Sequence, residues 1–96
     1  MTLWITGYIW REDVVDKLDR KHNLEIDEVE ELFHNNPHFQ RLERGHRPQE
    51  DLYTATGRTD AGRYLIVFFI YKKDGQALIV TARDMTSQER KRYGRK

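Results

Sequence analysis

The chain has 96 residues, a formal net charge of +1 and no cysteine. This length allows one small domain, residues 1–96, with a modest hydrophobic core. The lack of cysteine excludes a disulfide framework and thiolate chemistry, and the longest apolar run is too short to cross a bilayer. The N-terminus carries no signal-peptide pattern, so we expect a cytoplasmic protein with no membrane partner.

The charge is divided unequally along the chain. Residues 1–40 carry 4 Lys and Arg against 9 Asp and Glu, whereas residues 41–96 carry 13 against 7. This division predicts an acidic end and a basic end, and the basic end suits a polyanionic partner. Two solvated faces of opposite sign, without a specific partner, remain the alternative.

The first 23 residues predict a strand and a helix. Leu3–Trp10 is rich in aromatic and aliphatic side chains, as expected of a short strand, with a bend at Gly7. Glu12–His22 places its apolar residues at helical spacing. Asn23 follows, and asparagine tolerates the left-handed conformation that often ends a helix.

A second helix is expected over Ile26–Phe33. Asp27 and Glu30 have the spacing of a capping box with Asp in the first position. The turn-forming run Asn35-Asn36-Pro37 ends this helix, because the residue before a proline disfavours the helical conformation.

The remaining chain predicts an antiparallel sheet and a final helix. The expected elements are an edge strand His38–Glu43, a loop Arg44–Glu50, and strands Leu52–Arg58, Tyr64–Tyr71 and Ala77–Ala82. Thr86 and Glu89 form a T-x-x-E capping box that starts the last helix. The fold class is therefore α+β, an antiparallel sheet of about four strands with two N-terminal helices on one face and a short C-terminal helix.

The turns predict how the strands pair. A three-residue loop Asp60-Ala61-Gly62 with Gly62 left-handed places Thr56 opposite Ile66 and Arg58 opposite Tyr64. A two-residue hairpin Asp74-Gly75 places Lys73 opposite Gln76 and Ile66 opposite Arg83. Opposite residues share a face of the sheet, so Arg58, Tyr64 and Arg83 are expected together at one end of one face.

The two sheet faces both carry apolar residues under this register. Leu65, Val67, Phe69, Leu78 and Val80 are expected on the face that packs against the first two helices. The opposite face then carries Ile66, Phe68, Ile70 and Ile79. The last helix offers little apolar surface, so this second face is a candidate partner surface, unless that helix and the first strand cover it.

Two arginines and a tyrosine on one face suit a site for phosphate and base, because Arg binds phosphate oxygens bidentately and stacks on rings. The alternative is that both arginines pair with acids such as Asp84 or Asp60, or point into solvent. Glu89 is a candidate general base, although its capping position explains it without catalysis.

The four histidines do not predict a metal site. His34 and His38 are four residues apart, but Pro37 interrupts the helix between them. His22 lies on an apolar stripe and is expected to be a hydrogen-bonded buried histidine rather than a base. No Ser/His/Asp or Cys/His constellation can be assembled, and no cofactor is expected.

Several short motifs resemble the BrnT toxins of bacterial type II toxin–antitoxin systems, in the order found in that family. They are Tyr8-Ile9-Trp10, Lys21-His22, Gly57-Arg58 with Gly62-Arg63, Ala82-Arg83 with Met85-Thr86, and Glu89-Arg90 with Tyr93. Asn23 departs from the family, which usually has Gly after the Lys-His pair. Both residues can end a helix.

The resemblance implies a RelE-like fold, RNA cleavage that inhibits translation without metal, and a cognate antitoxin. It also implies a homodimer or a toxin–antitoxin hetero-oligomer. Carried over, the phosphate would be bound by Arg58, Arg63 and Arg83, with Glu89 and Tyr93 as further catalytic residues. The implied RNA-binding residues are Lys21, His22, Tyr64 and Arg90; of these, Lys21 and His22 are further candidates for proton transfer. A non-catalytic module that binds RNA or protein on the same fold is the alternative.

Overall fold

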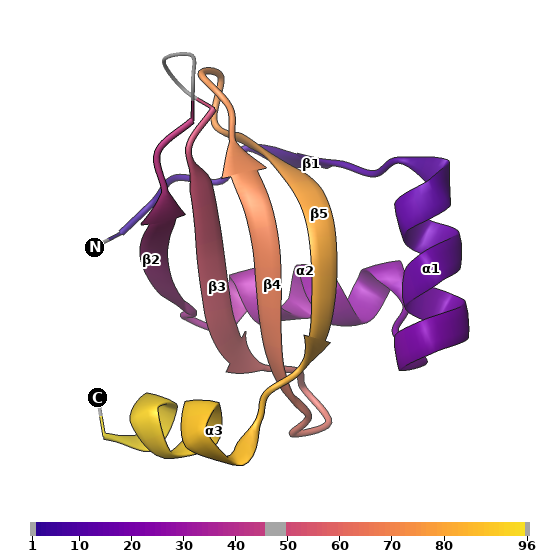
Figure 1. The fold of residues 1–96 in the computed structure, drawn as a ribbon, viewed down its shortest axis with the longest axis vertical. Coiled ribbons are helices and arrows are strands. Elements are labelled where there is room, and N and C mark those ends of the chain that lie inside the picture. The colour runs from indigo at the N-terminus through magenta and orange to yellow at the C-terminus, as the bar shows by residue number, and fades with distance from the viewer. Residues whose placement is uncertain (1, 46–49, 96) are drawn as a thin grey trace.

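A five-stranded sheet forms the centre of the computed structural model, which describes residues 2–45 and 50–95 (Figure 1). Along the sheet the strand order is β1-β5-β4-β3-β2. The strands are β1 (Gly7–Ile9), β2 (His38–Glu43), β3 (Leu52–Arg58), β4 (Tyr64–Tyr71) and β5 (Gln76–Asp84). Three helices complete the fold: α1 (Glu12–His22), α2 (Ile26–His34) and α3 (Ser87–Gly94).

The α+β class is confirmed, but the prediction of a four-stranded antiparallel sheet is wrong. The sheet is mixed, because β1 joins its edge parallel to β5, with Gly7 opposite Gln76 and Ile9 opposite Leu78. Only three residues of the expected strand Leu3–Trp10 pair in this way. A pairing so short and so distant in sequence leaves no periodic signal that could reveal its direction.

The hydrophobic core lies between one face of the sheet and the first two helices. The central strand β4 contributes Leu65, Val67 and Phe69, each with no exposed surface. Leu18 of α1 and Leu32 of α2 pack against them from the helical layer. Burying each such side chain stabilises the fold by about 1.5–3 kcal/mol, so this layer holds both helices on the sheet. In Figure 1, α2 passes behind the sheet and α3 lies at its lower end.

The helix ends show which capping residues act. Asn23 adopts the left-handed conformation as predicted, with φ of 51°. Its N–H donates to the Leu18 carbonyl. The capping box of α2 is formed by Glu25 and Glu28. The predicted pair of Asp27 and Glu30 is therefore wrong, because Glu25 is the last residue with extended backbone and Asp27 already lies inside the helix.

The pairing of β3 with β4 is confirmed. Thr56 lies opposite Ile66, Arg58 lies opposite Tyr64, and Gly62 has the expected positive φ of 89°. The loop from Arg44 to Glu50 connects β2 to β3, and residues 46–49 of this predicted loop lie outside the described residues.

The pairing of β4 with β5 follows the prediction at the end that holds Ile66 and Arg83, but not at the end next to the hairpin turn. Lys72 donates its N–H to the Gln76 carbonyl at 2.9 Å, so the hairpin loop has three residues rather than two. A bulge between Phe68 and Phe69, where Val80 is the extra residue of β5, shifts the register back and places Arg83 opposite Ile66.

The corrected register exchanges residues between the two faces. Ile79 lies opposite Phe69 on the helix-covered face and is 1% exposed, whereas Val80 at the bulge is 40% exposed. Leu78 lies opposite Ile70 and therefore shares a face with it. We call this face, which α1 and α2 do not cover, the helix-free face. The predictions for Ile79, Leu78 and Val80 are thus wrong. The helix-free face is still apolar, and α3 covers only its end near Tyr64.

No helix in the described part of the chain has both the length and the apolar character needed to span a membrane.

Candidate functional site

Arginine and tyrosine side chains gather where α3 crosses the end of the helix-free face. The guanidinium of Arg58 lies 5.1 Å from the ring centroid of Tyr64, and that of Arg90 lies 4.1 Å from it. The ring of Tyr93 meets Tyr64 edge to face, with centroids 6.0 Å apart. We call these four residues the arginine–tyrosine cluster. Strand β3 supplies Arg58 and β4 supplies Tyr64, while α3 supplies the other two.

The arginines of the cluster that face Tyr64 are available to a ligand. Across the ranges 2–45 and 50–95, no ion pair engages Arg58 or Arg90. A guanidinium on an aromatic face keeps its in-plane N–H donors free, because the stacking uses the flat side of the group. Two such groups on one tyrosine form a site that attracts phosphate.

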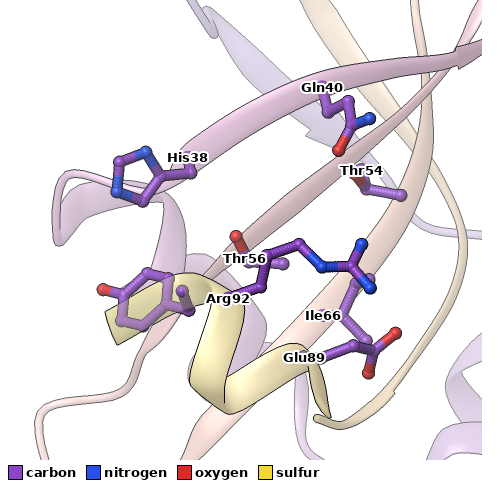
Figure 2. Close-up of a pocket in the computed structure, with 8 residues that line it drawn as sticks. His38, Gln40, Thr54, Thr56, Ile66, Glu89 and Arg92 are labelled. Atoms are coloured by element: carbon purple, nitrogen blue, oxygen red, sulfur yellow. The ribbon is translucent and has the colours of Figure 1, made fainter. Parts of the chain in front are cut away.

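A pocket of about 60 Å³ opens beside the cluster, between α3 and the sheet (Figure 2). His38 reaches the cluster from β2, since its ring meets Tyr93 edge to face at 5.4 Å. The pocket is lined by His38, Gln40, Thr54, Thr56, Ile66, Glu89, Arg92 and Tyr93. It therefore combines an imidazole, a phenol, a guanidinium and a carboxylate with neutral polar groups.

Arg83 shares the face with the cluster, as predicted, and is held by Glu89. The two carboxylate oxygens of Glu89 accept from Arg83 at 2.7 and 3.0 Å. Glu89 also accepts from the Thr86 N–H at 2.8 Å, which completes the predicted capping box of α3. The Arg83 guanidinium further lies 5.6 Å from the Phe68 ring centroid.

These contacts change the acid–base character of Glu89. The hydrogen bonds from Arg83, together with those from Thr86, lower the pKa of Glu89 from 4.5 to about 2. A carboxylate with so low a pKa is a weak base at neutral pH. The hydrogen bonds between Arg83 and Glu89 also raise the pKa of Arg83, which stays cationic. The geometry therefore makes Glu89 a group that docks α3 and orients Arg83.

Arg63 points to the opposite side of the sheet and joins the helical layer. Its guanidinium donates to both carboxylate oxygens of Asp84, at 2.7 and 3.1 Å. It also donates to Glu28 at 3.3 Å and to the backbone carbonyls of His22 at 2.7 Å and Asn23 at 2.8 Å. The hydrogen bonds lower the pKa of Asp84 and raise that of Arg63. These contacts tie the end of α1 and the start of α2 to the sheet.

The predicted site residues therefore fall into two groups. Arg58, Tyr64, Arg83, Glu89, Arg90 and Tyr93 come together at α3, whereas Arg63 and His22 meet in the helical layer. His22 enters this second group through its backbone carbonyl, and Lys21 beside it is an exposed residue of the last turn of α1.

The pocket adds residues that sequence reasoning missed as site residues, above all His38, Gln40, Thr54 and Arg92. His38 lies opposite Thr56, and Gln40 lies opposite Thr54. A signal existed in the alternation of polar residues along β2 and β3. It could not be used, because the β2–β3 register depends on a long connection and on a bulge between Arg41 and Glu43.

Among the described residues, no group of three or more His, Asp or Glu side chains is arranged so that it could hold a metal ion. Its cations can bind and polarise an anion, and its imidazole and phenol can move protons. This combination suits chemistry on a phosphate ester.

Two comparisons with known proteins bear on the chain. The family model described as ribonuclease toxin, BrnT, of type II toxin-antitoxin system matches residues 10–89. This range includes Arg58, Tyr64, Arg83 and Glu89, and it ends before Arg90. A search of curated proteins finds no match to the chain.

Proposed function

Because the chain belongs to the BrnT family of ribonuclease toxins from type II toxin–antitoxin systems, we propose that it is a metal-independent endoribonuclease that inhibits translation in the cytoplasm. We further propose that its sheet and helices form a RelE-like ribonuclease fold. The observation that carries the proposal is the arginine–tyrosine cluster beside a pocket that holds an imidazole and a phenol.

The proposed reaction is attack of an RNA 2′-hydroxyl on the adjacent phosphate. The 2′-oxygen forms a bond to phosphorus, the bond to the 5′-oxygen of the next nucleotide breaks, and a 2′,3′-cyclic phosphate results. Arg58 and Arg90 bind the phosphate, and Arg83, which Glu89 holds on β5, is the third candidate cation on the same face. Negative charge builds on the phosphoryl oxygens during the reaction, so fixed cations stabilise the transition state more than the ground state.

Two proton transfers accompany this reaction. One group removes the proton of the 2′-hydroxyl, and another supplies a proton to the departing 5′-oxygen. His38 and Tyr93 line the pocket and face each other at 5.4 Å between ring centroids, so they are our candidates for these roles. Glu89 is the weaker candidate, because Arg83 already occupies both of its oxygens.

The experiment compares single variants of the purified, antitoxin-free toxin on RNA. Arg58→Ala should lower the cleavage rate by roughly a hundredfold with an unchanged melting temperature, because a positioned donor contributes about 3 kcal/mol to such a transition state. Arg58→Lys should restore activity only in part, since Lys lacks the planar fork. Arg11→Ala is the control, because the Arg11 side chain pairs with Asp13 in an ion pair whose two side chains are 66% and 68% exposed. A chelator should leave cleavage unchanged.

Other outcomes would redirect the proposal. If Arg58→Ala cleaves at the wild-type rate, the cluster is not the site. If a chelator stops cleavage, the metal-independent reaction is wrong. RNA that stays intact with the wild-type protein, but binds it in a salt-sensitive way, would favour the non-catalytic binding module.

The family also implies a cognate antitoxin, and we propose that it binds the apolar helix-free face. Phe68, Ile70 and Leu78 lie partly exposed on this face, and the Arg83 guanidinium lies 5.6 Å from the Phe68 ring centroid. An acidic, amphipathic segment of the antitoxin would bury the apolar residues and neutralise the cluster. Ile70→Glu should weaken the complex by at least tenfold in titration calorimetry and leave RNA cleavage intact. An unchanged affinity would place the antitoxin elsewhere.

A further inference from the structure

Besides His38, the pocket beside the arginine–tyrosine cluster has a polar edge that the proposed phosphate chemistry does not use. His38 and Gln40 alternate along β2, and Thr56 and Thr54 face them from β3, so all four side chains share one face. Figure 2 shows Gln40 and Thr54 at one end of the pocket and His38 at the other. Ile66, only 7% exposed, provides an apolar floor.

The size of the pocket suits one small aromatic ring. A water molecule requires about 10–15 Å³ of such space, so about 60 Å³ accommodates roughly four to six groups of that size. The six ring atoms of a pyrimidine match this estimate, whereas the nine ring atoms of a purine exceed it. The pocket is therefore better matched to a single pyrimidine than to a larger purine.

The polar groups can read the edge of a base. An amide side chain such as that of Gln40 offers a donor and an acceptor side by side, and a threonine hydroxyl offers both. Within residues 2–45 and 50–95, no protein hydrogen bond engages the amide of Gln40, which is exposed to the pocket. Paired hydrogen bonds from Gln to a base are a common means of base discrimination.

The pocket also lies directly beside the proposed phosphate site. Tyr93 belongs both to the pocket lining and to the arginine–tyrosine cluster. A nucleotide whose base enters the pocket therefore brings its phosphate toward Arg58 and Arg90. The ring of Tyr93 offers a surface against which the base can lie.

We propose that this pocket binds the base of one unpaired nucleotide next to the scissile phosphate, with Gln40 as the residue that determines base specificity. This inference rests on the proposed ribonuclease function and adds its substrate preference, a pyrimidine at one defined position. The cleaved RNA is single-stranded at this position, because a paired base cannot enter a pocket closed by α3.

The first test sequences the cleavage ends of an RNA library with random bases. The wild-type protein should show a pyrimidine preference at one position beside the cut. Gln40→Leu should reduce that preference by about fivefold or more, the lower range for a base contact with two hydrogen bonds. Gln40→Glu, which replaces a donor by an acceptor, should change which base is preferred. Gln88→Glu adds the same charge on an exposed part of α3, outside the pocket, and should keep the wild-type preference.

Two results of this test would overturn the inference. Wild-type cleavage with no base preference beside the cut, or with a purine preference that Gln40→Leu retains, would show that the pocket does not read a base. A pyrimidine preference that is the same in Gln40→Leu would assign the selectivity to other residues.

A second test keeps the inference distinct from the ribonuclease proposal. Fluorescence anisotropy measures binding of short, non-cleavable 2′-O-methyl oligonucleotides that differ at one base. Tighter binding of pyrimidines, lost in Gln40→Leu and kept in Gln88→Glu, would support the pocket even if the protein cleaves no RNA. Equal binding of all bases by the wild-type protein would overturn it.

Discussion

The ion pair between Arg83 and Glu89 allows a quantitative prediction about the docking of α3. The difference between a pKa of 4.5 and about 2 for Glu89 corresponds to about 3 kcal/mol of stabilisation at neutral pH. The side chains of Arg83 and Glu89 remain 36% and 21% exposed, and solvent screening of such a pair reduces the figure to about 1–2 kcal/mol. Glu89→Gln should lower the free energy of unfolding by this amount, since Gln keeps the capping geometry.

The sign of the pH dependence follows from the lowered pKa. The stabilisation is complete above about pH 4.5 and is lost as the pH falls toward 2, where the folded protein binds the proton. Its contribution at pH 3 should be less than half of that at pH 7. Urea denaturation of the wild type, Glu89→Gln, Arg83→Gln and the double variant measures the coupling energy at both pH values.

One control variant and one threshold make this cycle decisive. Asp13→Asn removes a far more exposed ion pair with Arg11 and should cost less than about 0.5 kcal/mol. A coupling energy for Arg83 and Glu89 below about 0.3 kcal/mol, or one that does not change between pH 7 and pH 3, would refute the assignment of Glu89 as the residue that docks α3.

Three further predictions concern Arg63 and Asn23 in the helical layer and Tyr93 in the arginine–tyrosine cluster. Arg63→Ala should lower the free energy of unfolding by about 2–3 kcal/mol, because it leaves Asp84 and two backbone carbonyls without their donor; an unchanged urea midpoint would contradict this. Asn23→Ala should cost about 1 kcal/mol, while Asn23→Gly should be nearly neutral, as thermal melting can show. Tyr93→Phe keeps the ring contacts but should slow RNA cleavage by about a hundredfold; full activity would exclude the phenol from proton transfer.

The sequence predicts the site best where short turns determine the geometry. Three residues separate Thr59 from Arg63, and Gly62 alone can adopt the required backbone, so the pairing of Arg58 with Tyr64 follows directly. The placement of Arg83 opposite Ile66 is also correct, but through two errors that cancel. The hairpin loop is one residue longer than predicted, and the bulge at Val80 restores the register.

The parts that could not be predicted depend on contacts between distant segments. The pocket requires β2 beside β3, and the connection between them contains no tight turn that sets the register. The contact of Glu89 with Arg83 depends on the direction in which α3 leaves β5, which the capping box alone does not define. Arg63 directly precedes β4, and consecutive side chains of an extended chain point to opposite faces, so Arg63 and Tyr64 lie on opposite sides of the sheet.

The parallel pairing of β1 with β5 has a consequence for the order of folding. During synthesis, β1 and both N-terminal helices leave the ribosome well before Gln76, the residue that pairs with Gly7. Leu65, Val67 and Phe69 of β4 form the centre of the sheet face that α1 and α2 cover. The hydrophobic faces of the two helices therefore have no sheet to pack against until β4 and β5 have been synthesised. Local pairing of β3, β4 and β5 should therefore form first, with the N-terminal third docking afterwards onto a completed hairpin. Nascent chains arrested before β5 should be open to proteases throughout that third.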